Sequence, residues 1–158
     1  MTRASYLLLA LSLIASCVWA QQKPTLGENP PSPSLSGPRT YNTTDPRKLR
    51  RIRTIFVERI ENSLSDKLAD GLSKMGRFRV VTKPTEADAV LRGSCVDMRR
   101  LKSVHSEVFI ADTRGSTVWQ DVVRRPFSPP PLSKAVDETA TVILQHLAES
   151  VQGADRAN

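Results

Sequence analysis

Between residues 60 and 75, apolar residues recur three or four positions apart, which is the spacing of one helix face. The residues of this stripe are Ile60, Leu64, Leu68, Leu72 and Met75. Ser63 lies near the start and Asp66 follows three residues later, so we expect a capping box in which Ser63 caps the first turn. Gly76 follows the stripe, where a left-handed backbone would end the helix.

A second apolar stripe, near the end of the chain, predicts a closing helix. Its residues are Val136, Ala140, Ile143, Leu147 and Val151. Gly153 is expected to end this helix and to leave residues 153–158 as a frayed tail. Where the two helices meet a sheet, we expect the most deeply buried side chains to be Leu68, Leu72, Ile143 and Leu147.

Runs of β-branched and aromatic residues predict the strands of that sheet. The runs cover residues 53–57, 78–82, 87–98, 104–112 and 116–124. Between the last two, Thr113–Gly115 is short enough for a tight hairpin in which Gly115 takes a positive φ. The order β-α-β-β-β-β-α predicts an α+β domain: a mixed sheet of about five strands with two main helices packed on it. The first strand–helix–strand unit favours a right-handed parallel crossover.

The amino-terminal segment has the pattern of a secretory signal. Arg3 precedes a short apolar run, residues 6–15, which ends in small side chains. Ordinary cleavage after Val18-Trp19-Ala20 would make residues 1–20 a signal peptide and Gln21 the first mature residue. The stretch that ends at Cys17 also resembles a bacterial lipobox, in which that cysteine is acylated. The mass of the exported protein distinguishes the two outcomes, and either one places it in the periplasm or at the outer membrane.

Composition divides the rest of the chain into a linker and a domain. Residues 21–50 are rich in Pro and Ser and are expected to form an extended linker. Residues 51–152 are expected to form the single α+β domain. The net charge of +7 is concentrated at the junction: residues 21–53 contain seven basic and two acidic residues, whereas the chain from residue 54 onward contains 15 basic and 14 acidic ones.

The basic junction consists of Arg47, Lys48, Arg50, Arg51 and Arg53. We expect it to contact an anionic envelope surface, with a solvated linker end as the alternative. Nucleic acid is not an expected partner, because export is predicted and no aromatic stacking platform accompanies the cluster.

Three segments together carry a family resemblance: "LADGLSKMGRFRVV", "EADAVLRGSC" and "ADTRGSTVWQ". They resemble the amino-terminal domain of TolB and the related curli-secretion lipoprotein superfamily of bacterial envelope proteins. The resemblance implies an exported protein, either periplasmic or membrane-tethered, that takes part in envelope assembly or secretion. Only "KPTE" stands where the curli-secretion members carry a long pore-forming insertion, so no pore is expected.

The sequence offers few groups for catalysis. Cys95 and His105 could form a nucleophile and a base, with Asp97 or Asp112 as the orienting carboxylate. The stronger interpretation is that Cys95 is a buried apolar residue on its strand, and that His146 is a surface or half-buried helix residue. No His or Cys pair has metal-ligand spacing, and no Gly-rich phosphate loop follows a strand. We therefore expect no enzyme activity, no metal and no cofactor.

Strand alternation points to a binding face. Val90, Arg92, Ser94 and Val96 lie opposite the apolar set that runs from Ala89 to Cys95. A face that mixes apolar and charged side chains is typical of a protein interface, so these four residues are the candidate partner face. The alternative is a lipid or glycolipid carrier, or a lipopolysaccharide-assembly lipoprotein, which would need a deep apolar cavity. The large aromatic residues that could line one, Phe56, Phe78, Phe109, Trp119 and Phe127, are more simply explained as core.

Overall fold

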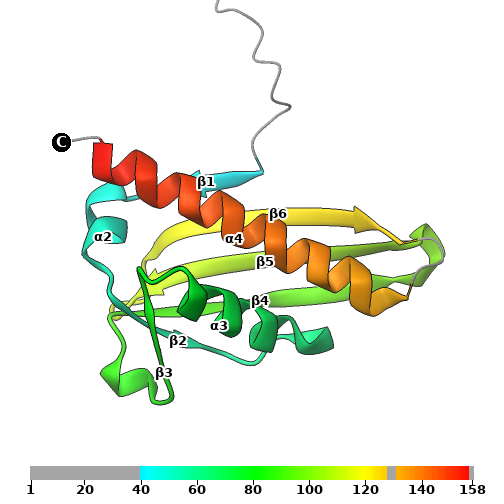
Figure 1. Ribbon diagram of the computed structural model, residues 1–158, viewed down its shortest axis with the longest axis horizontal. Helices are drawn as coiled ribbons and strands as arrows, with labels where there is room; N and C mark the ends of the chain where they lie inside the picture. The colour runs from blue at the N-terminus through cyan, green and yellow to red at the C-terminus, as the bar shows by residue number, and fades with distance from the viewer. Residues whose placement is uncertain (1–39, 128–130, 157–158) are drawn as a thin grey trace, which may run out of the picture. The chain divides into compact units, whose positions relative to one another are not determined.

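The computed structural model describes residues 40–127 and 131–156. In these residues a single mixed sheet contains six strands in the order β1-β6-β5-β4-β2-β3 (Figure 1). The strands are β1 (Tyr41–Thr43), β2 (Thr54–Val57), β3 (Arg79–Val81), β4 (Ala89–Met98), β5 (Ser103–Asp112) and β6 (Thr117–Pro126). The α-helices are α2 (Pro46–Arg51), α3 (Leu64–Lys74) and α4 (Leu132–Arg156), and single turns of 3-10 helix cover Glu61–Ser63, Pro84–Glu86 and Arg99–Leu101. The predicted α+β class is confirmed, with one more strand than the sequence indicated.

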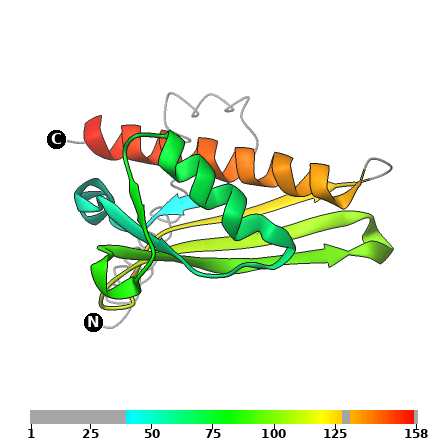
Figure 2. The same ribbon diagram turned by 60° about the horizontal axis from the view of Figure 1, so that its bottom comes forward.

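Both long helices pack on the same face of the sheet (Figure 2). Their apolar stripes meet the helix-facing side chains of the strands in one core. Helical spacing gathers the apolar residues of each helix on one face, and removing that apolar surface from water is favourable. The four residues expected to be most deeply buried are at most 1% exposed: Leu68, Leu72, Ile143 and Leu147. This prediction is confirmed.

Strand pairing follows the predicted connections. β2 is parallel to both β3 and β4, so the β2–α3–β3 unit is a parallel crossover as expected. β4, β5 and β6 form a long antiparallel meander. Gly115 has φ +81° in the β5–β6 turn and Gly76 has φ +65° after α3, which confirms both glycine predictions.

The start of α3 is built differently from the predicted capping box. Ser63 has φ +60° and makes no capping hydrogen bond. The turn before the helix is instead tied to β4: Asn62 Nδ2 donates to the Cys95 carbonyl at 2.7 Å, and Glu61 Oε2 accepts from the Cys95 amide at 3.0 Å. That amide lowers the pKa of Glu61 below its ordinary value. The prediction for Ser63 and Asp66 is therefore wrong, because tertiary partners replace the local cap.

The end of α4 also differs from the prediction. The helix continues through Gly153 to Arg156, and Gly153 does not have a positive φ. Val151 and Ala154 are buried on its last turns, so packing of this stripe sustains the helix beyond the glycine. Residues 153–156 of the predicted frayed tail are therefore helical, and residues 157–158 lie outside the described residues.

The domain begins earlier than residue 51. β1 pairs with β6, and Leu49 of α2 is fully buried in the core, so residues 41–51 belong to the sheet domain. The predicted linker end at residue 50 is therefore wrong. The segment is polar in composition, but the burial of Leu49 and the pairing of β1 hold it on the domain. The predicted signal peptide, Cys17 and the rest of the expected linker up to residue 39 lie outside the described residues. Within the described ranges, no helix has both the length and the apolar character needed to cross a membrane.

Candidate functional site: the uncovered face of the sheet

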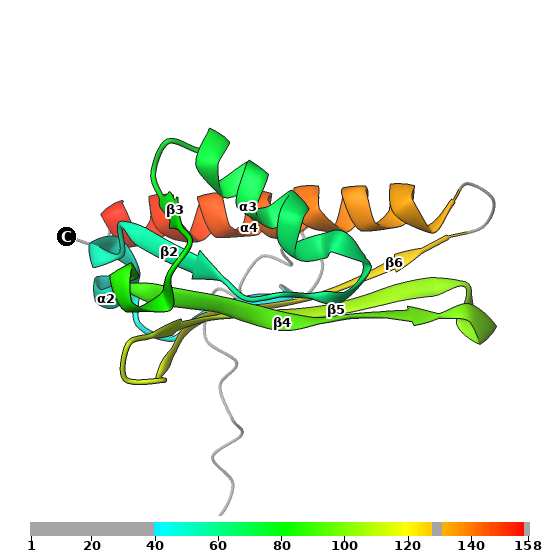
Figure 3. The ribbon, with the colours of Figure 1, turned by 90° about the horizontal axis from the view of Figure 1, so that it is seen from below.

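One face of the sheet carries neither of the long helices. Figure 3 shows α3 and α4 on one side of β4, β5 and β6, and no described helix on the other. Residues that pair across antiparallel strands share a face. The register therefore places four residues of β5 beside the predicted face: Val90 pairs with Ala111, Arg92 with Phe109, Ser94 with Glu107 and Val96 with His105. On β6 this face continues with Gln120, Val122 and Arg124.

The structure thus brings Val90, Arg92, Ser94 and Val96 together on the uncovered face, as the alternation indicated. Arg92 is exposed, Val96 is 51% exposed, and Val90 and Ser94 are half-buried. We define the uncovered face as these four residues together with their neighbours on the same side of the sheet: Phe56, His105, Glu107, Phe109, Gln120, Val122 and Arg124.

Two aromatic residues expected in the core lie on this side of the sheet. Phe56 pairs with Val90 and Phe109 pairs with Arg92, and both phenylalanines are half-buried. By contrast, Phe78 and Trp119 are buried as predicted. The sequence missed Phe56 and Phe109 because aromatic content alone does not say which face of a strand is covered. Their position gives the uncovered face large apolar contacts beside Arg92 and Glu107.

Cys95 and His105 do not form a nucleophile–base pair. Cys95 is 1% exposed on the helix-facing side and pairs with Ser106, whereas His105 pairs with Val96 on the uncovered face. The sheet separates the two side chains. Within the described ranges, no group of three or more His, Cys, Asp or Glu residues is arranged to hold a metal ion.

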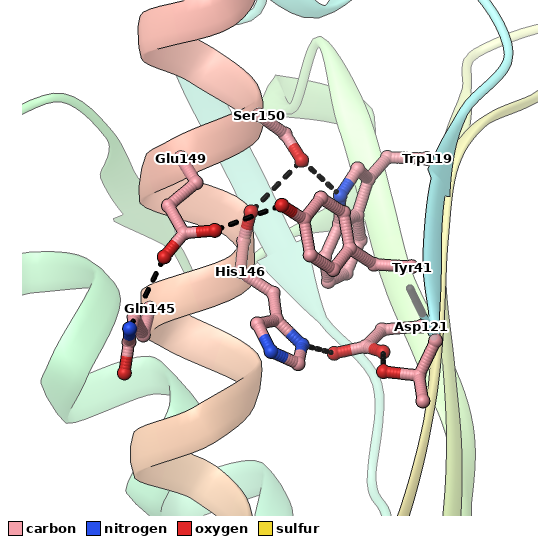
Figure 4. A network of polar contacts seen from close by, with 8 residues as sticks. Tyr41, Trp119, Asp121, Gln145, His146, Glu149 and Ser150 are labelled. Atoms are coloured by element: carbon pink, nitrogen blue, oxygen red, sulfur yellow. Dashed lines mark hydrogen bonds and ion pairs between the residues drawn. The ribbon is translucent and has the colours of Figure 1, made fainter. Parts of the chain in front are cut away.

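A polar network that the sequence did not indicate joins β1, β6 and α4 (Figure 4). Asp121 of β6 is fully buried. One of its carboxylate oxygens accepts from Thr40 Oγ1 at 3.0 Å, and the other shares a hydrogen bond of 2.8 Å with His146 Nδ1. The ring of His146 also contacts the ring of Tyr41, with 4.5 Å between centroids. A buried carboxylate needs such partners, because desolvation without them would be costly.

The same turn of α4 holds two further hydrogen-bonded groups. Tyr41 OH donates to Glu149 Oε2 at 2.8 Å. Trp119 Nε1 donates to Ser150 Oγ at 2.9 Å, and that hydroxyl donates to the His146 carbonyl at 2.8 Å. The one signal in the sequence was Asp121, a charged residue at a helix-facing position of a strand. Its partner His146 can be identified only when α4 is placed over the sheet. The network attaches the edge strand β1 to the core. The hydroxyls of Thr40, Tyr41 and Ser150 all donate hydrogen bonds within it.

The basic junction is part of the folded domain and not a free linker end. Lys48 Nζ lies 2.7 Å from Asp112 Oδ2, and the Arg50 carbonyl accepts from Arg77 Nη2 at 2.7 Å. Arg47, Arg51 and Arg53 remain exposed. The predicted contact of this segment with an anionic surface stays a prediction, now with Lys48 engaged by a carboxylate.

Replacement of Asp112 by Asn should lower the melting temperature at neutral pH. Lys48, together with the backbone amides of Ser116 and Arg114, lowers the pKa of Asp112. A depressed pKa means that the charged form stabilises the fold above the unfolded-state pKa, and that this contribution is lost as pH falls through the folded-state pKa. The difference between Asp112→Asn and the native protein should therefore vanish in acid.

Thermal unfolding followed by circular dichroism over a pH series measures this difference. Asp70→Asn is the matched control, because Asp70 pairs with Lys74 on the exposed surface of α3 and such pairs contribute little. A loss for Asp112→Asn that is equal at acid and neutral pH would show that its charge is not responsible.

Comparisons with known proteins show similarity in fold. No family model matches the sequence, and neither does any curated protein. A PelC dodecamer from Paraburkholderia phytofirmans aligns with a TM-score of 0.50 at 19% identity, over 68% of this chain and 95% of that chain. The lipoprotein GNA1162 from Neisseria meningitidis aligns with a TM-score of 0.44 at 14% identity, over 62% of this chain and 98% of that one. At these identities the likeness to PelC establishes a shared fold and nothing about activity.

Proposed function

We propose that this protein is a non-enzymatic adaptor of the bacterial envelope, exported to the periplasm or the outer membrane, that binds a protein partner through the uncovered face of its sheet. The observation that carries the proposal is the placing of both long helices on one side of the sheet. The other side presents half-buried Phe109 and Val122 beside exposed Arg92 and Val96. Apolar anchors within a polar surround are the anatomy of a non-obligate protein interface.

Export rests on the amino-terminal signal pattern, and the TolB-like and curli-secretion-like motifs support an envelope role. The fold shared with PelC is compatible with such a role, and the dodecameric state of PelC makes a second copy of this chain one partner to be tested. A lipid carrier receives less support. The hollow beside β1 and the end of α4 is lined largely by polar side chains, which do not suit acyl chains. A second hollow, beside β2 and the start of α3, mixes apolar Phe56 and Ile60 with charged groups such as Asp66.

Site-specific photocrosslinking in the native envelope tests the proposal. A photoreactive residue at Arg92 should give a discrete crosslinked protein, because Arg92 is exposed at the centre of the uncovered face. The matched control carries the same residue at Glu138, which is exposed on α4. The mass of the adduct shows whether the partner is a second copy of this chain or another protein.

A second variant connects the adduct with the chemistry of the face. Introducing Val96→Asp and Phe109→Ser into the Arg92 crosslinking protein should reduce the adduct at least ten-fold, since truncating anchor residues typically costs more than 1 kcal/mol each. Adducts of equal yield at Arg92 and Glu138, or none at Arg92, would contradict binding through this face.

A further inference from the structure

The turn between β4 and β5 combines exposed apolar and basic side chains. Among the described residues, the exposed large hydrophobics are Leu101, at 59%, and Val96, at 51%. Leu101 lies in the turn itself, and Val96 lies two positions before Met98, the last residue of β4. Single exposed leucines are common on protein surfaces, so Leu101 points to a binding site only together with the basic side chains around it.

Basic residues surround Leu101. Arg99, Arg100 and Lys102 are all exposed, and Arg124 continues the cluster on β6, where it pairs with His105. Asp97 is paired with Arg99 at 2.9 Å, and the Glu61 carboxylate accepts from the Cys95 amide three residues before the end of β4. We define the hairpin tip as residues 98–102. It carries three cations and one exposed leucine within five positions.

The backbone holds the hairpin tip in a defined shape. Arg99–Leu101 form one turn of 3-10 helix, and Lys102 closes it in a left-handed conformation with φ +46°. The Lys102 carbonyl accepts from the Phe127 amide at 2.7 Å, which ties the tip to the end of β6. The exposed side chains of the tip are therefore presented by a fixed turn.

We propose that the hairpin tip docks on the surface of an anionic lipid bilayer, with Leu101 entering the headgroup region and Arg100 and Lys102 contacting lipid phosphates. Each basic residue near an anionic membrane contributes about 1 kcal/mol to binding, which is a roughly five-fold change in affinity. Apolar side chains add burial, and Arg and Lys stems extend along the interface while their charges stay in water.

A lipid surface fits the tip better than a protein does. A stable protein interface needs about 800 Å² from each partner, whereas this site is the narrow end of one hairpin. Such an end penetrates a deformable headgroup layer more readily than it covers a rigid protein surface. The tip and α2 lie at opposite ends of the sheet (Figure 1). Leu49 and Ile52, the apolar residues nearest the α2 cations, are buried, so that end offers charge without an apolar anchor.

Vesicle cosedimentation tests the inference independently of the adaptor proposal, because it uses lipid alone. The protein used is the mature chain expected after removal of residues 1–20, so that no acyl chain on Cys17 contributes. Binding to phosphatidylglycerol vesicles, with neutral phosphatidylcholine vesicles for comparison, should fall roughly thirty-fold in the double variant Arg100→Ser/Lys102→Asn. Asparagine tolerates the left-handed backbone of position 102.

The matched control is Arg47→Ser/Arg51→Ser, which removes two exposed charges at the opposite end. It should change binding by less than three-fold. Loss in the α2 variant with none in the tip variant would overturn the inference in favour of the basic junction. Equal loss in both would also overturn it, because it would show attraction by net charge alone.

A fluorescence readout separates insertion from simple attraction. Trp119 is fully buried and is the sole tryptophan of residues 21–158, so Leu101→Trp adds one exposed reporter. Its emission should shift to shorter wavelength with phosphatidylglycerol vesicles and stay unchanged with phosphatidylcholine. An unshifted spectrum under conditions where the protein binds would show that the tip does not enter the bilayer, and would overturn the proposal. Circular dichroism of each variant confirms that it is folded.

Discussion

Leu68→Ala is expected to destabilise the domain by about 2–5 kcal/mol. Leu68 lies in the middle of α3 and is 0% exposed. Its truncation removes apolar surface from the core and leaves a cavity that the close-packed neighbours fill only in part. Since small domains are typically stable by about 5–15 kcal/mol, this is a large share of the total.

Denaturant unfolding measures the effect, and Leu101→Ala is the matched control. It is the same substitution at a leucine that is 59% exposed, so it should change the free energy of unfolding by less than about 0.5 kcal/mol. A change of well under 1 kcal/mol for Leu68→Ala would mean that α3 does not pack on the sheet through this stripe.

Gly93→Ala is expected to destabilise the protein by about 3 kcal/mol, the upper end of the usual cost of overpacking. A Cβ at position 93 would lie 2.1 Å from the backbone oxygen of Glu107 and 3.0 Å from the Cα of Val108. Neither atom belongs to a flexible side chain, so the central β4–β5 pairing would have to move. Gly93 is thus required for the close approach of two backbones, and not for a positive φ.

Gly153→Ala is the matched control for this substitution. An added Cβ meets nothing within 4 Å at position 153, which lies inside α4. Alanine should therefore stabilise the helix by about 0.5–1 kcal/mol. Opposite signs for the two Gly→Ala variants, measured by denaturant unfolding, are the expected result. A neutral Gly93→Ala would show that the strands can separate there at little cost.

Periodicity in the sequence located the two long helices and most of the sheet. Leu68 and Ile143 belong to apolar stripes that can be recognised from their spacing along the chain, and both residues are buried. The β5–β6 turn was equally predictable, since Gly115 supplies a conformation that other residues adopt at a cost. The candidate partner face, including Arg92 and Val96, followed from alternation along β4 alone.

Short elements, and contacts between residues far apart in the chain, could not be predicted from periodicity. β1 has three residues and α2 has six, too few for a pattern to stand out from their polar surroundings. Leu49 could be recognised as core only once α2 was placed against α4 and β6. The local cap predicted at Ser63 failed for a related reason, because Asn62 and Glu61 found partners on β4.

The sequence by itself determined the α+β class, the two apolar stripes and the alternation of the long strands, because these depend on spacing along the chain. Only the tertiary structure decided which sheet face the described long helices cover, and with it the separation of Cys95 from His105 and the placing of Phe109 beside Arg92. It also decided that Asp121 meets His146. These outcomes depend on strand order and on the placing of α4. Both depend on the free energy gained when surfaces from distant parts of the chain are buried against each other. A local sequence pattern does not show which distant surfaces will meet.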